Sequence, residues 1–414
     1  MRRCVVIGSG AREHALAWAL AKGADVVVTP GNPGIAAHGI TCVDTPSTEL
    51  DAELFVIGPD QQVVDGLADA LRAQGKTVVG PGADGARLEG SKAYLKEFLA
   101  SANVPTAAYG VFDDEGEALA FLATMTPPYV IKTDGLAAGK GVLVTRDFDE
   151  ASSDVREKLS GRVFGGAGQT VVIEEGLDGP ECSLMVLCDG TNVVALVPSQ
   201  DFKRLSDGDA GVNTGGMGAY APMTSLSPFE FDEIMERIIA PTVRELKRRD
   251  IDYRGVLYAG IMLTSGGPKI LEYNARFGDP ETEVLVPLYG DSLFDLLLQI
   301  GEGRLEGPSP AATGAAVTVI LASHGYPQSP RKGDVISGLG ADGQLEHQVE
   351  GVTVFHAGTA IGADGHFVTA GGRAVAVTGV GETLALARRR AYEGAALITF
   401  EGRVMRSDIA LSVA

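Results

Sequence analysis

The chain has 414 residues, of which 45% are hydrophobic, and it carries a formal net charge of -20. This length predicts two to four domains with enough buried surface to fold without disulfide bonds. The negative charge disfavours nucleic acid and anionic membranes as partners, so small anions must be bound by local lysines, arginines and backbone amides.

The four cysteines, which form no CxxC pair, are Cys4, Cys42, Cys182 and Cys188. The first three lie beside strand-like apolar runs. We expect them to be buried and reduced, as in a cytoplasmic protein, rather than bound in disulfides or to zinc. No apolar run reaches the roughly 18 residues of a membrane span, and the stretch before Gly8 is too short for a signal peptide. We expect a monomer or a weak dimer.

Residues 1–90 alternate strand and helix patterns. The expected strands are 4–7, 25–29, 54–57 and 77–79, and the expected helices are 11–21 and 63–74. This alternation predicts a doubly wound parallel sheet. Gly8 and Gly10 open the first helix, but Glu13 stands at the third glycine position of a dinucleotide fingerprint. A phosphate group, rather than NAD, is therefore expected at this helix N-terminus.

A helix is expected at 91–101, followed at 113–175 by two short strands and two helices that form a mobile lid. Within it, a strand ends in Lys132 and leads into a glycine loop that carries Lys140. Glycines allow backbone amides to approach anionic oxygens, and the lysines add positive charge. The spacing excludes a Walker A loop, although a glycine-rich hairpin whose lysines face water would look the same.

The segment 171–183 runs from an apolar strand through a short linker into another strand. Its apolar Leu177 and its carboxylate Glu181 are the residue types that an adenine ring and a ribose diol need. Acidic residues in a turn are usually only solvated, so this segment becomes informative in combination with its neighbours.

An antiparallel sheet is expected over 176–310, flanked by helices at 228–249 and 292–302. Its last strand, 269–274, places Glu272 and Asn274 on one face and Leu271 and Tyr273 on the other. A carboxylate and an amide oxygen side by side suit Mg²⁺, and Arg276 brings a guanidinium to the same strand end. A solvated strand end with a paired arginine is the competing interpretation.

Residues 306–310 look like a linker, and 311–414 return to β-rich alternation with one helix at 383–394. We therefore expect three domains, at 1–90, 91–310 and 311–414. The last is a small closing domain. His14, His324 and His356 have no spaced partner that would make a metal site, so they are expected to be structural.

Together these motifs resemble the ATP-grasp ligases, and more closely the phosphoribosylamine–glycine ligase family of purine biosynthesis. The matching segments are 8–15, 30–34, 89–93, 132–142, 213–220, 257–260, 272–281 and 355–359. The resemblance covers nearly the whole chain. It implies an α/β and α+β multidomain protein, in which an ATP-grasp fold follows a doubly wound parallel-sheet domain and precedes a small β-rich closing domain. It also implies that glycine is joined to 5-phosphoribosylamine through glycyl phosphate, while ATP is cleaved to ADP and phosphate.

The resemblance also implies residue roles. Glu174 and the Leu177 backbone would hold adenine, Glu181 would hold ribose, and Glu272 and Asn274 would bind Mg²⁺ or Mn²⁺. The ATP phosphates would be bound by Lys92, Lys132 and Lys140. The catalytic residues would be Lys132, Arg276 and Asp279. The other substrates would be bound by Gly8, Gly10, Glu13, Asp201, Asn213, Thr214, Gly215, Gly216 and Arg276.

The chain departs from the family pattern at 60–62, at Phe202, where His is expected, and at Val212, where Pro is expected. These positions surround the phosphoribosylamine rather than the ATP. Two other interpretations remain at this point: a different ATP-grasp ligase, such as one that carboxylates an amine, and a non-catalytic nucleotide sensor. The metal ligands and the phosphate lysine disfavour the sensor.

Overall fold

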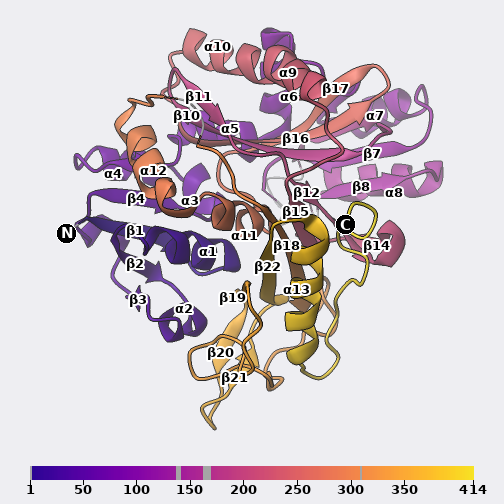
Figure 1. The fold of residues 1–414 in the computed structure, drawn as a ribbon. Helices are drawn as coiled ribbons and strands as arrows, with labels where there is room; N and C mark the ends of the chain where they lie inside the picture. Colours follow the sequence, from indigo (N-terminus) through magenta and orange to yellow (C-terminus); the bar gives the residue numbers. More distant parts are fainter. Residues whose placement is uncertain (1, 137–140, 162–168, 308–309) are drawn as a thin grey trace.

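The computed structural model describes residues 2–136, 141–161, 169–307 and 310–414 (Figure 1). The N-terminal part is a parallel sheet in the order β3-β2-β1-β4-β5, as expected. Its strands are β1 (Arg3–Gly8), β2 (Asp25–Pro30), β3 (Thr41–Cys42), β4 (Leu54–Ile57) and β5 (Val78–Val79). Its helices are α1 (Ala11–Leu20), α2 (Pro33–Ala37), α3 (Asp60–Val64), α4 (Leu67–Arg72) and α5 (Ala83–Gly90). The central residues of β1, β2 and β4 are apolar and buried, as expected where helices cover both faces of a parallel sheet.

The single helix expected at 63–74 is wrong: α3 and α4 are separate. Gly66 stands between them with a φ of 79°, a left-handed conformation that ends the first helix and that glycine adopts readily.

The lid is a four-stranded antiparallel sheet in the order β6-β9-β7-β8, with strands β6 (Tyr109–Phe112), β7 (Tyr129–Thr133), β8 (Val142–Thr145) and β9 (Val171–Glu175). Helices α7 (Glu115–Leu122) and α8 (Phe148–Leu159) contact it and share a separate apolar core with it. The expected two helices are present, but three strands rather than two lie within 113–175. The unit therefore packs around an apolar core of its own, and its movement as a lid stays a prediction. Residues 162–168, between α8 and β9, lie outside the described residues.

The central sheet is antiparallel, in the order β11-β10-β16-β17, as expected. Its strands are β10 (Glu181–Asp189), β11 (Val193–Ala195), β16 (Arg254–Thr264) and β17 (Gly267–Asn274). The expected helix at 228–249 consists of α9 (Pro228–Ile234), a π-helical turn (Met235–Ile239) and α10 (Ala240–Arg248). Helices α6 (Lys92–Ala102) and α12 (Leu293–Glu302) contact this sheet, and α11 (Glu281–Leu285) lies against β15 (Gly218–Ala221), β18 (Ala315–Ala322) and α1.

The C-terminal sheet, in the order β12-β15-β18-β22-β19, includes strands from the middle of the chain. It consists of β12 (Gln200–Asp201), β15 (Gly218–Ala221), β18 (Ala315–Ala322), β19 (Val352–His356) and β22 (Arg373–Gly381). Helix α13 (Leu384–Leu397) packs on β18 and β22, and two hairpins project: β13 (Arg204–Ser206) with β14 (Ala210–Asn213), and β20 (Thr359–Ile361) with β21 (Phe367–Thr369). The C-terminal part of the chain therefore shares one sheet with β12 and β15, through the pairing of β15 with β18.

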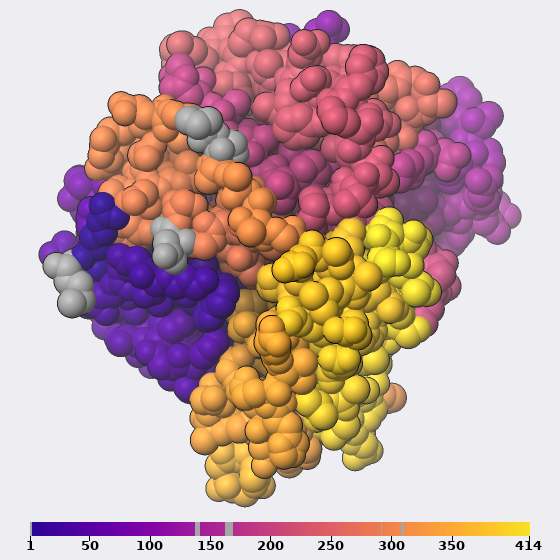
Figure 2. All heavy atoms as spheres, viewed as in Figure 1, coloured from indigo at the N-terminus to yellow at the C-terminus, as the bar shows by residue number. Residues whose placement is uncertain are grey.

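The N-terminal and C-terminal parts meet at buried histidines, and Figure 2 shows the two surfaces side by side. His14 accepts a hydrogen bond from the His356 backbone N–H at 2.8 Å, and its Nε2 lies 2.9 Å from Nδ1 of His38. Burial lowers the pKa of His356 to about 4 and that of His14 well below its ordinary value. These histidines are therefore neutral packing groups, as expected for His14 and His356.

All four cysteines are free, and three of them are buried. Within the described residues, no single helix is long and apolar enough to cross a membrane, and the two shorter helices that reach this length together meet at 109°.

Candidate active site

Two lysines and a glutamate form a buried cluster between the lid and α6. The Lys132 ammonium lies 2.9 Å from one carboxylate oxygen of Glu174, and the Lys96 ammonium lies 3.0 Å from the other. Thr106 accepts a further hydrogen bond from Lys96 at 2.8 Å. Burial lowers the pKa of Lys96 to about 8, against the attraction of Glu174. Sequence reasoning missed Lys96, although it lies one helical turn after Lys92.

The start of α6 holds the beginning of the glycine loop. Lys92 donates a hydrogen bond to the Gly135 carbonyl at 2.9 Å, and Asp134 accepts one from the Ala93 backbone N–H at 3.1 Å. Burial lowers the pKa of Lys92, with Glu272 opposing the shift. Lys92 and Lys132 therefore lie at one site, while Lys140 falls outside the described residues.

Strand β17 presents Glu272 and Asn274 two residues apart in regular register, opposite Gly260 and Tyr258. The expected alternation fails one residue earlier, because a bulge at Leu271 leaves that side chain only partly buried, while Tyr273 is 2% exposed. The Leu271 carbonyl instead accepts a hydrogen bond from Lys132 at 3.2 Å. The bulge therefore brings the lid lysine to the strand that carries Glu272.

Lys203 lies between the two expected carboxylate positions. Its ammonium is 2.9 Å from Glu181 and 3.8 Å from Glu272. Desolvation opposes its charge, but Glu181 and Glu272 raise the pKa of Lys203 well above its ordinary value. Desolvation would likewise raise the pKa of Glu272, but Lys203, Lys132 and Lys92 lower it. Glu272 is therefore ionised at neutral pH, and Lys203 is a site residue that sequence reasoning did not single out.

Arg276 is held at the end of β17. Its guanidinium lies 2.9 Å from Glu89 and donates a hydrogen bond to the Asn274 side-chain oxygen at 3.1 Å. Desolvation disfavours its charge, but Glu89 and Asp60 raise the pKa of Arg276. The Nε of Arg276 is buried with no hydrogen-bond partner among the described residues.

Arg373 from β22 joins the other expected substrate positions, and sequence reasoning missed it. It lies 2.9 Å from the Asp279 carboxylate and donates hydrogen bonds to the carbonyls of Gly215, at 2.5 Å, and Asp279, at 3.1 Å. Asp201 lies close by, since a Cβ on Gly216 would come within 2.8 Å of its Oδ1. Desolvation and Glu281 raise the pKa of Asp201 well above its ordinary value.

The remaining loop residues lie in the same region. Thr214 bonds the Lys203 carbonyl through its backbone N–H and its hydroxyl, at 2.8 and 2.9 Å. Asn213 ends β14 opposite Arg204. The loop that follows β14 is therefore fixed directly to the backbone of Lys203.

In the N-terminal domain, the Gly10 backbone N–H donates to Glu13 at 2.6 Å, and Arg12 lies 2.6 Å from the same carboxylate. Glu13 is thus buried and bonded within its own helix end. Side chains at Gly8 and Gly58 would collide with it, at 2.6 and 1.9 Å. Gly10 lies near Asp279, because a Cβ built on Gly10 would lie 3.9 Å from the Asp279 carboxylate.

Leu177 lies on the five-residue connection between β9 of the lid and β10 of the central sheet, and it is partly buried. Glu181 is the first residue of β10, with its carboxylate on Lys203. The carboxylate of Glu174 pairs with Lys96 and Lys132, so it is already occupied by two ammonium groups. The expected nucleotide contacts thus border the joint between the lid and the central sheet.

The chain matches three family models described as phosphoribosylglycinamide synthetase: the N domain over residues 2–89, the ATP-grasp (A) domain over 90–282 and the C domain over 316–412. Among curated relatives, phosphoribosylamine–glycine ligase of Streptomyces coelicolor is 45% identical over 100% of this chain and 99% of its own length. The Escherichia coli enzyme of the same name is 44% identical over 98% of this chain and 97% of its own.

Among solved structures, phosphoribosylamine–glycine ligase from Thermotoga maritima superposes with a TM-score of 0.88 at 39% identity, covering 99% of this chain and 100% of that one. A biotin carboxylase domain from Hydrogenobacter thermophilus has a TM-score of 0.71 at 17% identity, covering 98% of this chain and 91% of that one, and shares the fold. With all three domain models matched in order, the chain belongs to the phosphoribosylglycinamide synthetase family of ATP-grasp ligases.

Proposed function

We propose that this protein joins glycine to 5-phosphoribosylamine, with cleavage of ATP to ADP and phosphate. The observation that carries the proposal is that Lys132, from β7 of the lid, reaches the end of β17 that carries Glu272 and is followed by Arg276. Full-length relatives named for this activity support it.

The reaction needs an activated carboxylate, because the carboxylate oxygens of glycine are poor leaving groups toward an amine. Glycine attacks the γ-phosphorus and forms glycyl phosphate, and the ribosylamine nitrogen then displaces phosphate. Such transfers depend on positioning and charge neutralisation more than on covalent catalysis. Lys92 and Lys132 neutralise the phosphates, and Arg276 binds the glycine carboxylate.

Glu272 and Asn274 fit a divalent cation such as Mg²⁺ or Mn²⁺. The carboxylate is ionised, the amide oxygen is on the same strand two residues away, and both are hard oxygen donors. The described residues contain no cluster of three or more acidic, histidine or cysteine ligands, which suits a cation that shares its ligands with phosphate oxygens. When bound, the cation would supply charge neutralisation at the transferring phosphoryl group.

The other contacts are proposed from the resemblance to the family. Adenine would lie beside Leu177 and near Glu174, whose carboxylate is already paired with Lys96 and Lys132, and ribose would lie at Glu181. The phosphate of phosphoribosylamine would lie at the Gly8–Gly10 turn, at the N-terminal end of α1. Asp279, Arg373 and the loop at 213–216 face the space between that turn and Arg276.

The lid at 113–175 excludes water from the acyl phosphate, which would otherwise hydrolyse. The domain boundaries near 90 and 310, the cytoplasmic location and a monomeric or weakly dimeric state belong to the same proposal.

The test measures ADP release with glycine and freshly made phosphoribosylamine, omitting each in turn. Heavy-oxygen label in the glycine carboxylate should pass one atom per turnover to inorganic phosphate. Unlabelled phosphate would exclude glycyl phosphate. Turnover that requires bicarbonate in place of glycine would favour a carboxylating ligase, with which this chain shares the fold.

A further inference from the structure

The hairpin of β13 and β14 lacks an apolar core of its own. Residues 206–212, which form its tip, are exposed, and its register shifts between Arg204 and Ser206. A two-stranded hairpin of this kind is marginally stable by itself. Yet its base carries Lys203 on one side and the loop at 213–216 on the other, so its position decides where these site residues lie.

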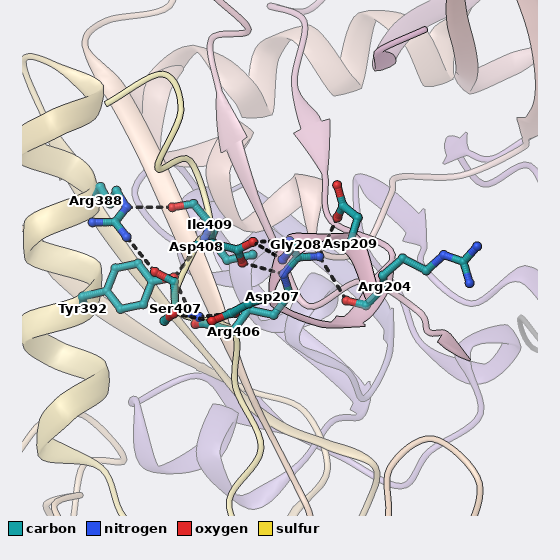
Figure 3. Close-up of polar contacts among 10 residues, drawn as sticks. All are labelled: Arg204, Asp207, Gly208, Asp209, Arg388, Tyr392, Arg406, Ser407, Asp408 and Ile409. Atoms are coloured by element: carbon teal, nitrogen blue, oxygen red, sulfur yellow. Dashed lines mark hydrogen bonds and ion pairs between the residues drawn. The ribbon is translucent and has the colours of Figure 1, made fainter. Parts of the chain in front are cut away.

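Arg406, near the end of the chain, holds the hairpin (Figure 3). Its guanidinium donates to the Arg204 carbonyl at 3.2 Å and to Asp209 at 2.7 Å. Both oxygens of Asp408 accept from the other side of the same fork, each at 2.7 Å. The plane also lies over the ring of Phe202, 4.9 Å from its centre. Arg406 is only 1% exposed, so these bonds act in a medium where water competes little.

Two neighbours of Arg406 extend the contact. Ser407 donates its backbone N–H to Asp207 at 2.8 Å, and its hydroxyl contacts the same carboxylate. Asp408 accepts a hydrogen bond from the Gly208 backbone N–H at 2.8 Å. The segment 406–408 therefore holds the hairpin tip as well as its base.

The same segment is fixed to α13 from behind. Arg388 donates to the carbonyls of Ile409, at 2.9 Å, and Ser407, at 2.7 Å, and Tyr392 donates its hydroxyl to the Arg406 carbonyl at 3.0 Å. Ile409 is fully buried and would meet a side chain at Gly218 within 2.9 Å. The C-terminal domain thus provides a rigid anchor for the hairpin.

The hairpin base then fixes the ammonium that lies between Glu181 and Glu272. The Phe202 backbone pairs with the start of β15. Its N–H donates to the Gly218 carbonyl at 2.9 Å, and its carbonyl accepts from the Met217 N–H at 2.8 Å. Lys203 stands between the two residues that Arg406 contacts, Phe202 and Arg204. Phe202 is also one of the positions at which the chain departs from the expected family pattern, and the flat ring suits a guanidinium above it.

We propose that Arg406 is a positioning residue for the reaction: through Phe202 and Arg204 it holds Lys203 at the nucleotide carboxylates. This inference rests on the proposed function, in which Glu181 binds the ribose of ATP and Glu272 binds the divalent cation at its phosphates. Without Arg406 the hairpin frays, and Lys203 no longer balances the two carboxylates.

The first variant is Arg406→Met, which keeps the stem and removes the fork. Arg390→Met is the matched control, since Arg390 also lies on the C-terminal domain but contacts Glu350 and the Val380 carbonyl. We expect an increase of about tenfold in the KM for ATP and in the dissociation constant for ATP measured by calorimetry, as for the loss of one or two buried hydrogen bonds. Arg406→Lys should restore part of the affinity, because it keeps a charge over Phe202.

The second variant, Asp207→Ala with Asp209→Ala, covers the case in which the loss of a buried arginine prevents folding. Both carboxylates are exposed. The change removes the contacts of Arg406 and Ser407 with the hairpin tip, while Arg406 keeps Asp408 and the Arg204 carbonyl. Trypsin, which cuts after Lys203 and Arg204, should cleave both variants faster at these bonds than the wild type or the control. This readout and calorimetry need no turnover.

Variants that lose thermal stability but keep wild-type ATP affinity and wild-type cleavage at 203–204 would overturn the inference. A wild-type protein that binds ATP but does not require glycine for ADP release would overturn the proposed function alone.

Discussion

The Lys132 ammonium on β7 lies 2.9 Å from the Glu174 carboxylate on the adjacent strand β9, and both side chains are buried. The lysine is thereby aimed before any phosphate arrives, since a flexible side chain with a fixed partner needs little reorganisation. Its second bond, to the Leu271 carbonyl at 3.2 Å, points it along β17 toward Glu272. The lid and the proposed metal strand are therefore joined by one charged group.

Lys132→Met should lower kcat/KM by about 10²-fold or more, because one preorganised electrostatic donor is lost while the stem volume is kept. Steady-state ADP release measures the effect. Lys269→Met is the control, since Lys269 also pairs with a glutamate, Glu175 at 3.0 Å, but lies on the partly exposed part of β17. Equal losses in the two variants would contradict the assignment of Lys132.

Glu272→Gln and Asn274→Leu should each abolish most activity and raise the concentration of Mg²⁺ needed for half-maximal rate. Glu272→Gln removes the negative charge and one carboxylate oxygen, and Asn274→Leu removes the amide oxygen, while the packing of the strand depends on Tyr273 instead. Thermal unfolding should stay close to that of the wild type. Near wild-type turnover in both variants would remove the metal assignment.

Glu181→Ala should raise the KM for ATP more than it lowers kcat. A ribose contact far from the reacting phosphorus binds ground state and transition state about equally. The variant also removes the nearer of the two carboxylates that Lys203 contacts, so that Lys203 keeps only Glu272 of this pair, at 3.8 Å. A defect confined to kcat would instead place Glu181 in the chemical step.

The deprotonation of Lys96 should raise the free energy of unfolding of the protein as the pH rises from about 8 to 10.5. The pKa of Lys96 in the folded protein is about 8, below its ordinary value of 10.5, because burial disfavours its charge. The folded state therefore binds fewer protons than the unfolded state across this window, so unfolding becomes harder as pH rises. The contribution should reach about 3 kcal/mol in full.

Denaturant unfolding of the wild type and of Lys96→Met should be compared across that pH range. The difference between their free energies of unfolding measures the contribution of Lys96, since the other groups titrate in both proteins. The gap should grow in favour of the wild type as pH rises. A constant gap would mean that Lys96 keeps its ordinary pKa in the folded protein.

The alternation of apolar residues was enough to predict the parallel N-terminal sheet, the antiparallel central sheet and the helices of the lid, because these patterns are local. It failed where a single residue changes the path of the chain. Gly66 divides one expected helix, and the bulge at Leu271 shifts the face of β17. Neither event alters the hydrophobic pattern over a long enough window to be seen.

The sequence by itself determined the family, the order of the domains and the motif residues that the proposed chemistry uses, since these depend on residue type and spacing along the chain. Only the tertiary structure decided which groups meet. Lys96, Lys203, Arg373 and Arg406 lie in no continuous motif with their partners, and Arg373 comes from a strand that follows Asp279 by 94 residues. Their roles arise from contacts between distant elements, and ion pairing and desolvation depend on distance in space rather than on separation in sequence.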